Sequence, residues 1–246
     1  MSRRLLFALL WAAPLPAAPV PESVSHAKAF KATFGASRTP APDCSFKFDG
    51  TTLTAELSKE WVGDQYGPMD CLRTERSIAG DFEMTVTMRT TAPAEPPKDG
   101  GKGGKRCDLG GGLAAWVPDP KNPKKVATGA QEREKLVSFC RYYNFEGEPG
   151  PGESRSWSKG NYANYPETVY EGSAEGGDPT EVVHLRLTRT GGTLASATRA
   201  DGEKWKEFCS RAVEVADTLS VGVWAFNGTG KQYDVVFEKF SLRASK

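Results

Sequence analysis

Residues 181–210 read EVVHLRLTRTGGTLASATRADGEKWKEFCS, and this stretch decides the fold. Apolar and polar residues alternate at its start, which is typical of a β-strand with one face toward solvent. The apolar positions are Val183, Leu185 and Leu187, and the polar positions are His184, Arg186 and Thr188. Gly191-Gly192 and Asp201-Gly202 then supply the positive φ angles that tight hairpin turns require. The stretch therefore predicts a β-meander of three consecutive antiparallel strands.

The same alternation recurs on both sides of this meander. Phe82, Met84, Val86 and Met88 fall on one face of a predicted strand, so a one-residue shift in register would expose all four. The segment LSVGVWAF at residues 219–226 divides into two apolar faces. These faces are Leu219, Val221 and Val223 on one side and Trp224 and Phe226 on the other.

About ten or eleven strands are expected, at the spacing of an antiparallel sandwich. Two of them are joined at Ala79-Gly80-Asp81. Others cover residues 45–48, 51–57, 109–117, 136–145 and 233–242. Segments rich in Pro and Gly predict long exposed loops at residues 92–108, 119–135 and 146–180. The expected fold class is all-β.

The first residues have the pattern of a secretory signal. A basic start at Ser2-Arg3-Arg4 precedes an apolar run that is too short to span a bilayer, and small residues follow near Ala17. We expect a signal peptide at residues 1–17, a linker or loosely docked arm at 18–43, and one domain at 44–246. The product is expected to be secreted, periplasmic or at the cell surface.

Charge and cysteine content narrow the expected partners. A formal net charge of +1 gives no reason to expect nucleic acid or an anionic membrane surface. Five cysteines follow the expected cleavage site, where export would allow disulfides to persist. The sequence does not choose a pairing among Cys44, Cys71, Cys107, Cys140 and Cys209.

Metal and cofactor signals are weak. No C-x-x-C occurs, and His26 and His184 are the only two histidines, which disfavours zinc bound through sulfur. Asp178, Glu175 and nearby backbone carbonyls could hold calcium, but the spacing matches no calcium motif. We therefore expect no metal and no cofactor.

The order of five segments resembles a known family. The segments are GDFEMTVTMR, GGGLAAWV, VVHLRLTRTGGTLASATRADGEKW, LSVGVWAFN and VVFEKFSL. Over about residues 46–243 they are similar to the concanavalin A-like lectin/glucanase superfamily. They look most like its secreted bacterial domains of unknown function, including those of planctomycetes. The resemblance implies a jelly roll, and because the superfamily includes binding modules, glycoside hydrolases and polysaccharide lyases, it does not assign a reaction.

Catalytic candidates are few. Retaining glucanases of this superfamily carry E-x-D-x-x-E on one strand, and no such triplet is present. Glu75 and Glu83 lie on neighbouring predicted strands and could form an acid pair, although single glutamates are ordinary on an exposed strand face.

A lyase would need a base beside groups that neutralise a uronate carboxylate. His184 and Arg186 share one face of a predicted strand, and Arg141 and Tyr143 share a face of another. A cleft could be built from these four residues, but polar residues on a solvated sheet face are the more favoured interpretation.

Residues 146–180 carry the signal for ligand binding. This predicted loop combines flat aromatic rings with amide groups, the mixture that holds sugar faces and hydroxyls. The candidates are Trp157, Asn161, Tyr162, Asn164, Tyr165 and Tyr170. Alternatively, the rings form a small core within the loop itself.

The sequence favours an exported, non-catalytic binding module, with carbohydrate as its expected ligand. The alternatives are a polysaccharide-degrading enzyme, either a hydrolase or a lyase, and a structural cell-surface domain. Asn227-Gly228-Thr229 matches a glycosylation sequon, but we interpret it as a hairpin turn.

Overall fold

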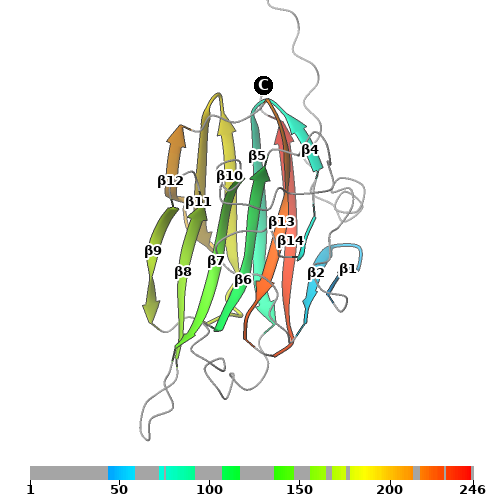
Figure 1. The fold of residues 1–246 in the computed structure, drawn as a ribbon, viewed down its shortest axis with the longest axis vertical. Helices are drawn as coiled ribbons and strands as arrows, with labels where there is room; N and C mark the ends of the chain where they lie inside the picture. The colour runs from blue at the N-terminus through cyan, green and yellow to red at the C-terminus, as the bar shows by residue number, and fades with distance from the viewer. Residues whose placement is uncertain are drawn as a thin grey trace, which may run out of the picture.

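The computed structural model describes ten segments of the chain, and they form fourteen strands in two antiparallel sheets (Figure 1). The described residues are 44–58, 72–74, 76–91, 107–116, 136–146, 156–164, 168–175, 178–212, 217–229 and 231–244. Within them no helix is long and apolar enough to cross a membrane. The predicted antiparallel β-sandwich is confirmed. The expected signal peptide, the linker and Trp61 lie outside the described residues.

Sheet I has seven strands in the order β1-β2-β14-β5-β10-β11-β12. Their bounds are Ser45–Phe48 for β1, Thr52–Leu57 for β2, Tyr233–Ala244 for β14, Phe82–Thr91 for β5, Val183–Thr190 for β10, Thr193–Ala200 for β11 and Lys206–Ala212 for β12.

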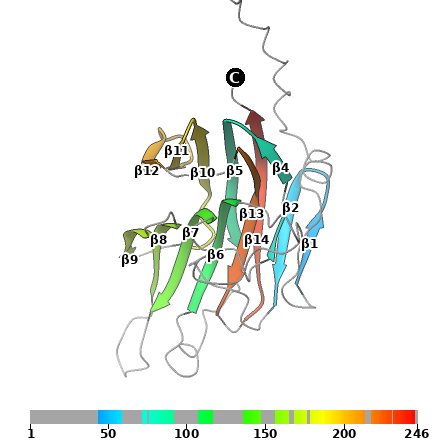
Figure 2. The same cartoon turned by 45° about the horizontal axis from the view of Figure 1, so that its top comes forward.

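Sheet II also has seven strands, in the order β3-β13-β6-β7-β8-β9, with β4 pairing beside β3 on β13. Their bounds are Leu72–Arg73 for β3, Thr218–Asn227 for β13, Cys107–Trp116 for β6, Leu136–Glu146 for β7, Ser156–Asn164 for β8, Thr168–Glu175 for β9 and Arg76–Ala79 for β4. In both views the β9 edge of sheet II and the β12 edge of sheet I lie on the same side, opposite β1 (Figure 2).

The predicted meander is confirmed as β10, β11 and β12. The register runs from Val183↔Ala200 to Thr190↔Thr193, so Gly191 and Gly192 form a two-residue turn. Gly191 has a φ of 57°, which is the left-handed backbone that such a turn requires. The Asp81 carboxylate accepts a hydrogen bond from the Gly191 amide at 2.8 Å, which anchors the turn to the start of β5.

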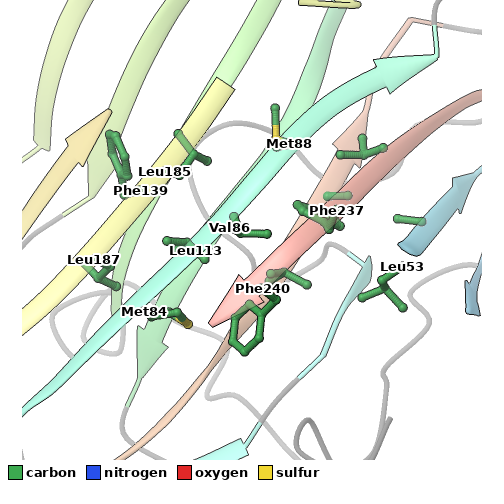
Figure 3. Close-up of a cluster of buried hydrophobic side chains, with 14 of the residues drawn as sticks. Leu53, Met84, Val86, Met88, Leu113, Phe139, Leu185, Leu187, Phe237 and Phe240 are labelled. Atoms are coloured by element: carbon green, nitrogen blue, oxygen red, sulfur yellow. The ribbon is translucent and has the colours of Figure 1, made fainter. Parts of the chain in front are cut away.

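The main core lies between the sheets. Phe82, Met84, Val86 and Met88 are at most 1% exposed, which confirms the predicted face of β5. Figure 3 shows Met84, Val86 and Met88 among side chains from both sheets, including Leu185 of β10, Leu113 of β6 and Phe237 of β14. Burying one such side chain contributes about 1.5–3 kcal/mol. This burial fixes the strand register, because a one-residue shift would lose several contributions at once.

A second apolar cluster lies on the opposite face of sheet II. Its members are Ala114, Trp116, Cys140, Tyr142, Trp224 and Phe226. Trp224 and Phe226 stack with their ring centroids 5.2 Å apart, while Leu219, Val221 and Val223 belong to the main core. The two apolar faces predicted for residues 219–226 are therefore confirmed.

The two strands predicted to join at Ala79-Gly80-Asp81 are confirmed as β4 and β5, and they lie in different sheets. β4 pairs with β13 in sheet II, whereas β5 pairs with β10 and β14 in sheet I. Gly80 has a φ of 73°, and its turn carries the chain from one sheet to the other. Glu75 lies outside the described residues, so its pair with Glu83 stays a prediction.

The prediction of a loop at residues 146–180 is wrong. β8 pairs with β7 along its whole length, from Ser138↔Asn164 to Glu146↔Ser156, and β9 then pairs with β8. These strands lie at the edge of sheet II and read SWSKGNYAN and TVYEGSAE. Their sequences lack the apolar alternation that is typical of a strand packed on a core. Backbone hydrogen bonds to the neighbouring strands hold them in the sheet instead.

Asn227 forms a turn as predicted, but the turn is not a hairpin because it links β13 in sheet II to β14 in sheet I. Its buried amide nitrogen donates to the carbonyl oxygens of Ser58 at 2.8 Å and Lys231 at 2.6 Å. Its amide oxygen accepts from the Thr229 amide at 3.0 Å and the Thr229 hydroxyl at 2.8 Å. Both the amide nitrogen and the amide oxygen of Asn227 therefore form hydrogen bonds that stabilise the turn.

Candidate functional site

The outer face of sheet I, which points away from the main core, carries a row of polar side chains. We call it the polar face. Register places Thr87 of β5, His184 of β10 and Arg199 of β11 directly side by side on this face. Arg186 lies two residues further along β10, opposite Thr85. Three rigid, adjacent strands thus position the polar groups.

His184 is held at both ring nitrogens. Its Nδ1 lies 3.0 Å from the Thr87 hydroxyl, and its Nε2 lies 2.9 Å from Oδ1 of Asp201. Because a carboxylate only accepts, Nε2 carries a proton and donates it to Asp201, and in the neutral ring Nδ1 accepts from Thr87. His184 was expected to face solvent, but only 8% of it is exposed. Neither nitrogen can take a proton from a substrate without breaking an existing hydrogen bond.

Asp201 begins the turn between β11 and β12, and 77% of its side chain is exposed. The hydrogen bond from His184 is the main cause that holds the pKa of Asp201 below its usual value. The charges of His184, Lys239 and Arg199 act in the same direction. The first residue of this turn is therefore a carboxylate that stays ionised to lower pH than usual.

Trp205 follows this turn and packs against two arginines. The guanidinium carbon of Arg186 lies 4.6 Å from the Trp205 ring centroid, and that of Arg199 lies 4.8 Å from it. All three side chains are half-buried. Among the described residues no carboxylate is in ion-pair contact with either arginine, and Nε of Arg199 is buried without a hydrogen-bond partner. We call these three residues the arginine–tryptophan cluster.

Arg141 and Tyr143 lie elsewhere, on the face of sheet II that is turned toward sheet I. Tyr143 belongs to the main core, and Arg141 lies 3.9 Å from Glu181 in an ion pair. Burial raises the pKa of Tyr143 well above its usual value. Because His184 projects from the opposite face of sheet I, the structure does not bring these residues together with His184 and Arg186.

Glu83 also lies on the polar face, opposite Thr188 and Arg243. Asp178, which was considered as a calcium ligand, accepts hydrogen bonds from the Thr180 amide at 2.8 Å and hydroxyl at 2.7 Å. In the part of the chain that the structure describes, no three His, Cys, Asp or Glu side chains converge in a way that could hold a metal ion.

Most of the predicted binding residues lie on β8 and β9. Tyr162 is opposite both Cys140 and Tyr170, whereas Asn161 is opposite Arg141 and Glu171. Trp157 is opposite Phe145, and Asn164 is opposite Ser138 and Thr168. Because successive residues of a strand alternate between the two faces of a sheet, positions 157 and 161 lie on one face of sheet II and positions 162 and 164 on the other. Tyr165 lies outside the described residues.

Sequence reasoning missed the roles of Thr87, Asp201, Arg199 and Trp205. One signal was available, because counting back from the two-residue Gly191-Gly192 turn places Arg199 opposite His184. No periodicity places Trp205, since it lies in the short connection before β12.

Comparison with known proteins finds likeness in structure only. No family model and no curated protein match the chain. A functionally unknown protein from Saccharomyces cerevisiae matches with a TM-score of 0.54 and 14% identity over 87% of this chain and 97% of that one. A PL-14 alginate lyase from Aplysia kurodai matches with a TM-score of 0.51 and 10% identity over 93% and 100%.

A xylan beta-1,4-xylosidase from Bacillus halodurans matches with a TM-score of 0.51 and 12% identity, over 94% of this chain but only 41% of that one. At such low identity these matches show the fold alone. The chain is an antiparallel β-sandwich of the concanavalin A-like, jelly-roll type.

Proposed function

We propose that this protein is a non-catalytic carbohydrate-binding module that holds its ligand on the polar face of sheet I. The observation that carries the proposal is the half-buried Trp205 ring, fixed over Arg186 and Arg199 beside the His184–Asp201 hydrogen bond. Two of the similar structures are named as an alginate lyase and a xylosidase, which makes a saccharide the first ligand to test.

The polar face combines the features that a sugar site needs. An indole ring offers a flat apolar surface for a pyranose face, and the surrounding hydroxyl, carboxylate and guanidinium groups offer hydrogen bonds to sugar hydroxyls. The groups stand on packed strands and on a turn tied to β10 by His184, so little ordering is required on binding.

Binding without catalysis is favoured by the state of His184. A general base needs a free nitrogen within reach of the substrate proton. Both nitrogens of His184 already have partners, and the ring is buried against Thr87 and Asp201. The residue therefore serves to position the turn that carries Asp201 and leads to Trp205.

The last two strands of sheet II, β8 and its edge neighbour β9, offer a second binding site. Tyr162 and Tyr170 are direct cross-strand neighbours, with the amide residues Asn161 and Asn164 in the same strand as Tyr162. Directly opposed residues in an antiparallel pair share one face of the sheet. This pairing keeps Tyr162 and Tyr170 as candidates for sugar contact, in addition to Trp157.

We also propose that the protein is exported, in keeping with the resemblance to secreted bacterial domains of the planctomycete type. The support is the basic and apolar pattern of residues 1–17. N-terminal sequencing of the protein from the culture fluid or periplasm of an expressing bacterium would show a start near residue 18. Retention of Met1 in the cell-associated fraction would contradict export.

A glycan array followed by calorimetry tests the binding proposal. Trp205→Ala should reduce affinity for the bound glycan at least about tenfold, whereas the neighbouring exposed change Lys204→Ala should leave it unchanged. Trp157→Ala and Tyr162→Ala test the second binding site in the same assay. Loss of binding in these variants alone would move the site to β8 and β9, and the absence of any bound glycan would refute the proposed function.

A further inference from the structure

We infer that the ligand of the polar face is an acidic polysaccharide, whose uronate carboxylates bind Arg186 and Arg199. This inference rests on the proposed function, because it specifies the class of saccharide held at the same site. It starts from the charge balance of sheet I.

Several basic side chains of sheet I have a carboxylate partner. Lys47 contacts Glu56 in an ion pair, Arg89 lies 3.6 Å from Glu238, and His184 lies 2.9 Å from Asp201. Arg186 and Arg199 differ, since no described carboxylate is in ion-pair contact with either of them. Both guanidinium groups nevertheless lie within 5 Å of one indole ring.

Two like charges gathered on one ring repel each other, and half-burial weakens their hydration. The electron-rich face of Trp205 offsets part of this cost, but a cation–π contact does not neutralise charge. A bound anion would remove the remaining imbalance. The cluster therefore has the electrostatics of an anion site placed beside an aromatic surface.

The donors also suit a planar anion. A guanidinium group that packs over an aromatic ring contacts the ring with its flat face. The N–H groups lie in the guanidinium plane, so they stay available for two parallel hydrogen bonds to a carboxylate. Nε of Arg199 is a buried donor with no acceptor among the described residues. Asp201 does not fill this role, because it accepts from His184 and 77% of its side chain is exposed.

A uronate-containing chain fits this arrangement better than a nucleic acid does. The net charge of +1 provides no extended basic surface for a phosphate backbone. A uronate chain places a carboxylate on a sugar ring, so Arg186 and Arg199 could bind the anion while Trp205 contacts the pyranose.

Calorimetry and affinity electrophoresis with polygalacturonate or alginate test the inference, with the carboxyl-reduced form of each polymer as the matched neutral ligand. Arg186→Gln combined with Arg199→Gln should weaken uronate binding at least about tenfold, since hydrogen bonds to charged groups are at stake. Arg243→Gln, on the same face, and Arg76→Gln, on sheet II, remove the same charge elsewhere and should change affinity less than about twofold. Thermal melts establish that each variant folds.

Arg186→Lys and Arg199→Lys separate charge from geometry. Each keeps the positive charge but loses the planar donor pair, so each should weaken binding of the uronate polymers while leaving any binding to dextran sulfate largely intact. Equal affinity for the carboxyl-reduced polymers, or binding to dextran sulfate alone, would overturn the inference. A neutral glycan whose binding is lost in Trp205→Ala but kept in the double glutamine variant would uphold the proposed function and refute the acidic ligand. No binding to any glycan would refute both.

Discussion

Nε2 of His184 lies 2.9 Å from Oδ1 of Asp201, and this hydrogen bond joins β10 to the turn between β11 and β12. Trp205 follows that turn by three residues and packs over Arg186 and Arg199. The hydrogen bond at His184 therefore helps to position the ring of the arginine–tryptophan cluster.

Asp201→Asn should loosen this turn in a pH-dependent way. The hydrogen bond from His184 lowers the pKa of Asp201, so the stabilising effect is present above the usual aspartate pKa and is lost as pH falls through the lower, folded value. The variant should have a lower melting temperature than the wild type at neutral pH. The difference should vanish in strong acid, where the wild-type carboxyl is itself neutral. Thermal melts across the acidic range, with Trp205 fluorescence as a second readout, provide the measurement.

A melting difference of the same size at every pH would show that the effect of Asp201→Asn comes from the shape of the turn. Asp49→Asn is a useful comparison, because hydrogen bonds from the backbone amides of Thr51 and Thr52 lower the pKa of Asp49 at another exposed turn. It should show acid dependence without any change in Trp205 fluorescence.

Gly111→Ala tests how closely the sheets and strands pack at the centre of β6. A Cβ atom at Gly111 would lie 2.8 Å from the Trp224 carbonyl oxygen and 3.1 Å from both Phe237 and Val235. Because a backbone oxygen cannot easily move away, we expect a loss of about 1–3 kcal/mol in the free energy of unfolding, measured with urea. Gly192→Ala is the control, since nothing lies within 4 Å of its added Cβ.

The fold could be predicted because its main signals are local. A two-residue glycine turn fixes the β10–β11 register, and alternating apolar residues from Phe82 to Met88 select the core face. β8 and β9 could not be predicted in the same way, since strands with few apolar residues form through pairing with their neighbours. The sheet to which β4 and β5 belong is a non-local outcome of packing, which the turn at Gly80 does not encode.

Only part of the candidate site could be predicted from the sequence. His184 and Arg186 could be assigned to one face from alternation, and Arg199 could have been added from the hairpin register. The contact of Trp205 with both guanidinium groups depends on the path of residues 201–205. This connection shows no periodic pattern of apolar residues from which its path could be predicted. The burial of His184 likewise depends on that connection and on Thr87 of another strand.

Asn227→Ala should destabilise the link between the two sheets. The change removes donors to the carbonyl oxygens of Ser58 and Lys231 and an acceptor for Thr229, at a position that is 0% exposed. Leaving buried groups without partners costs about 1–3 kcal/mol each, so we expect a loss of at least about 2 kcal/mol in urea unfolding. The same burial predicts no glycan at Asn227 when the folded protein meets a glycosylating enzyme, as mass spectrometry would show. Thr51→Ala, at an exposed turn, is the control and should cost little.

Tyr143→Phe should leave the protein as stable as the wild type or slightly more stable. Among the described residues no group accepts a hydrogen bond from the Tyr143 hydroxyl, which is buried in the main core, so its removal relieves a desolvation cost of about 1 kcal/mol. Burial raises the pKa of Tyr143, so its ionisation opposes folding at high pH, and stability is lost as pH rises past the usual tyrosine pKa. Urea unfolding at neutral and alkaline pH should therefore show a growing advantage for Tyr143→Phe, while Tyr143→Leu, which also loses the ring, should be destabilised at both. A loss of stability in Tyr143→Phe at neutral pH would mean that the hydroxyl makes a favourable contact in solution.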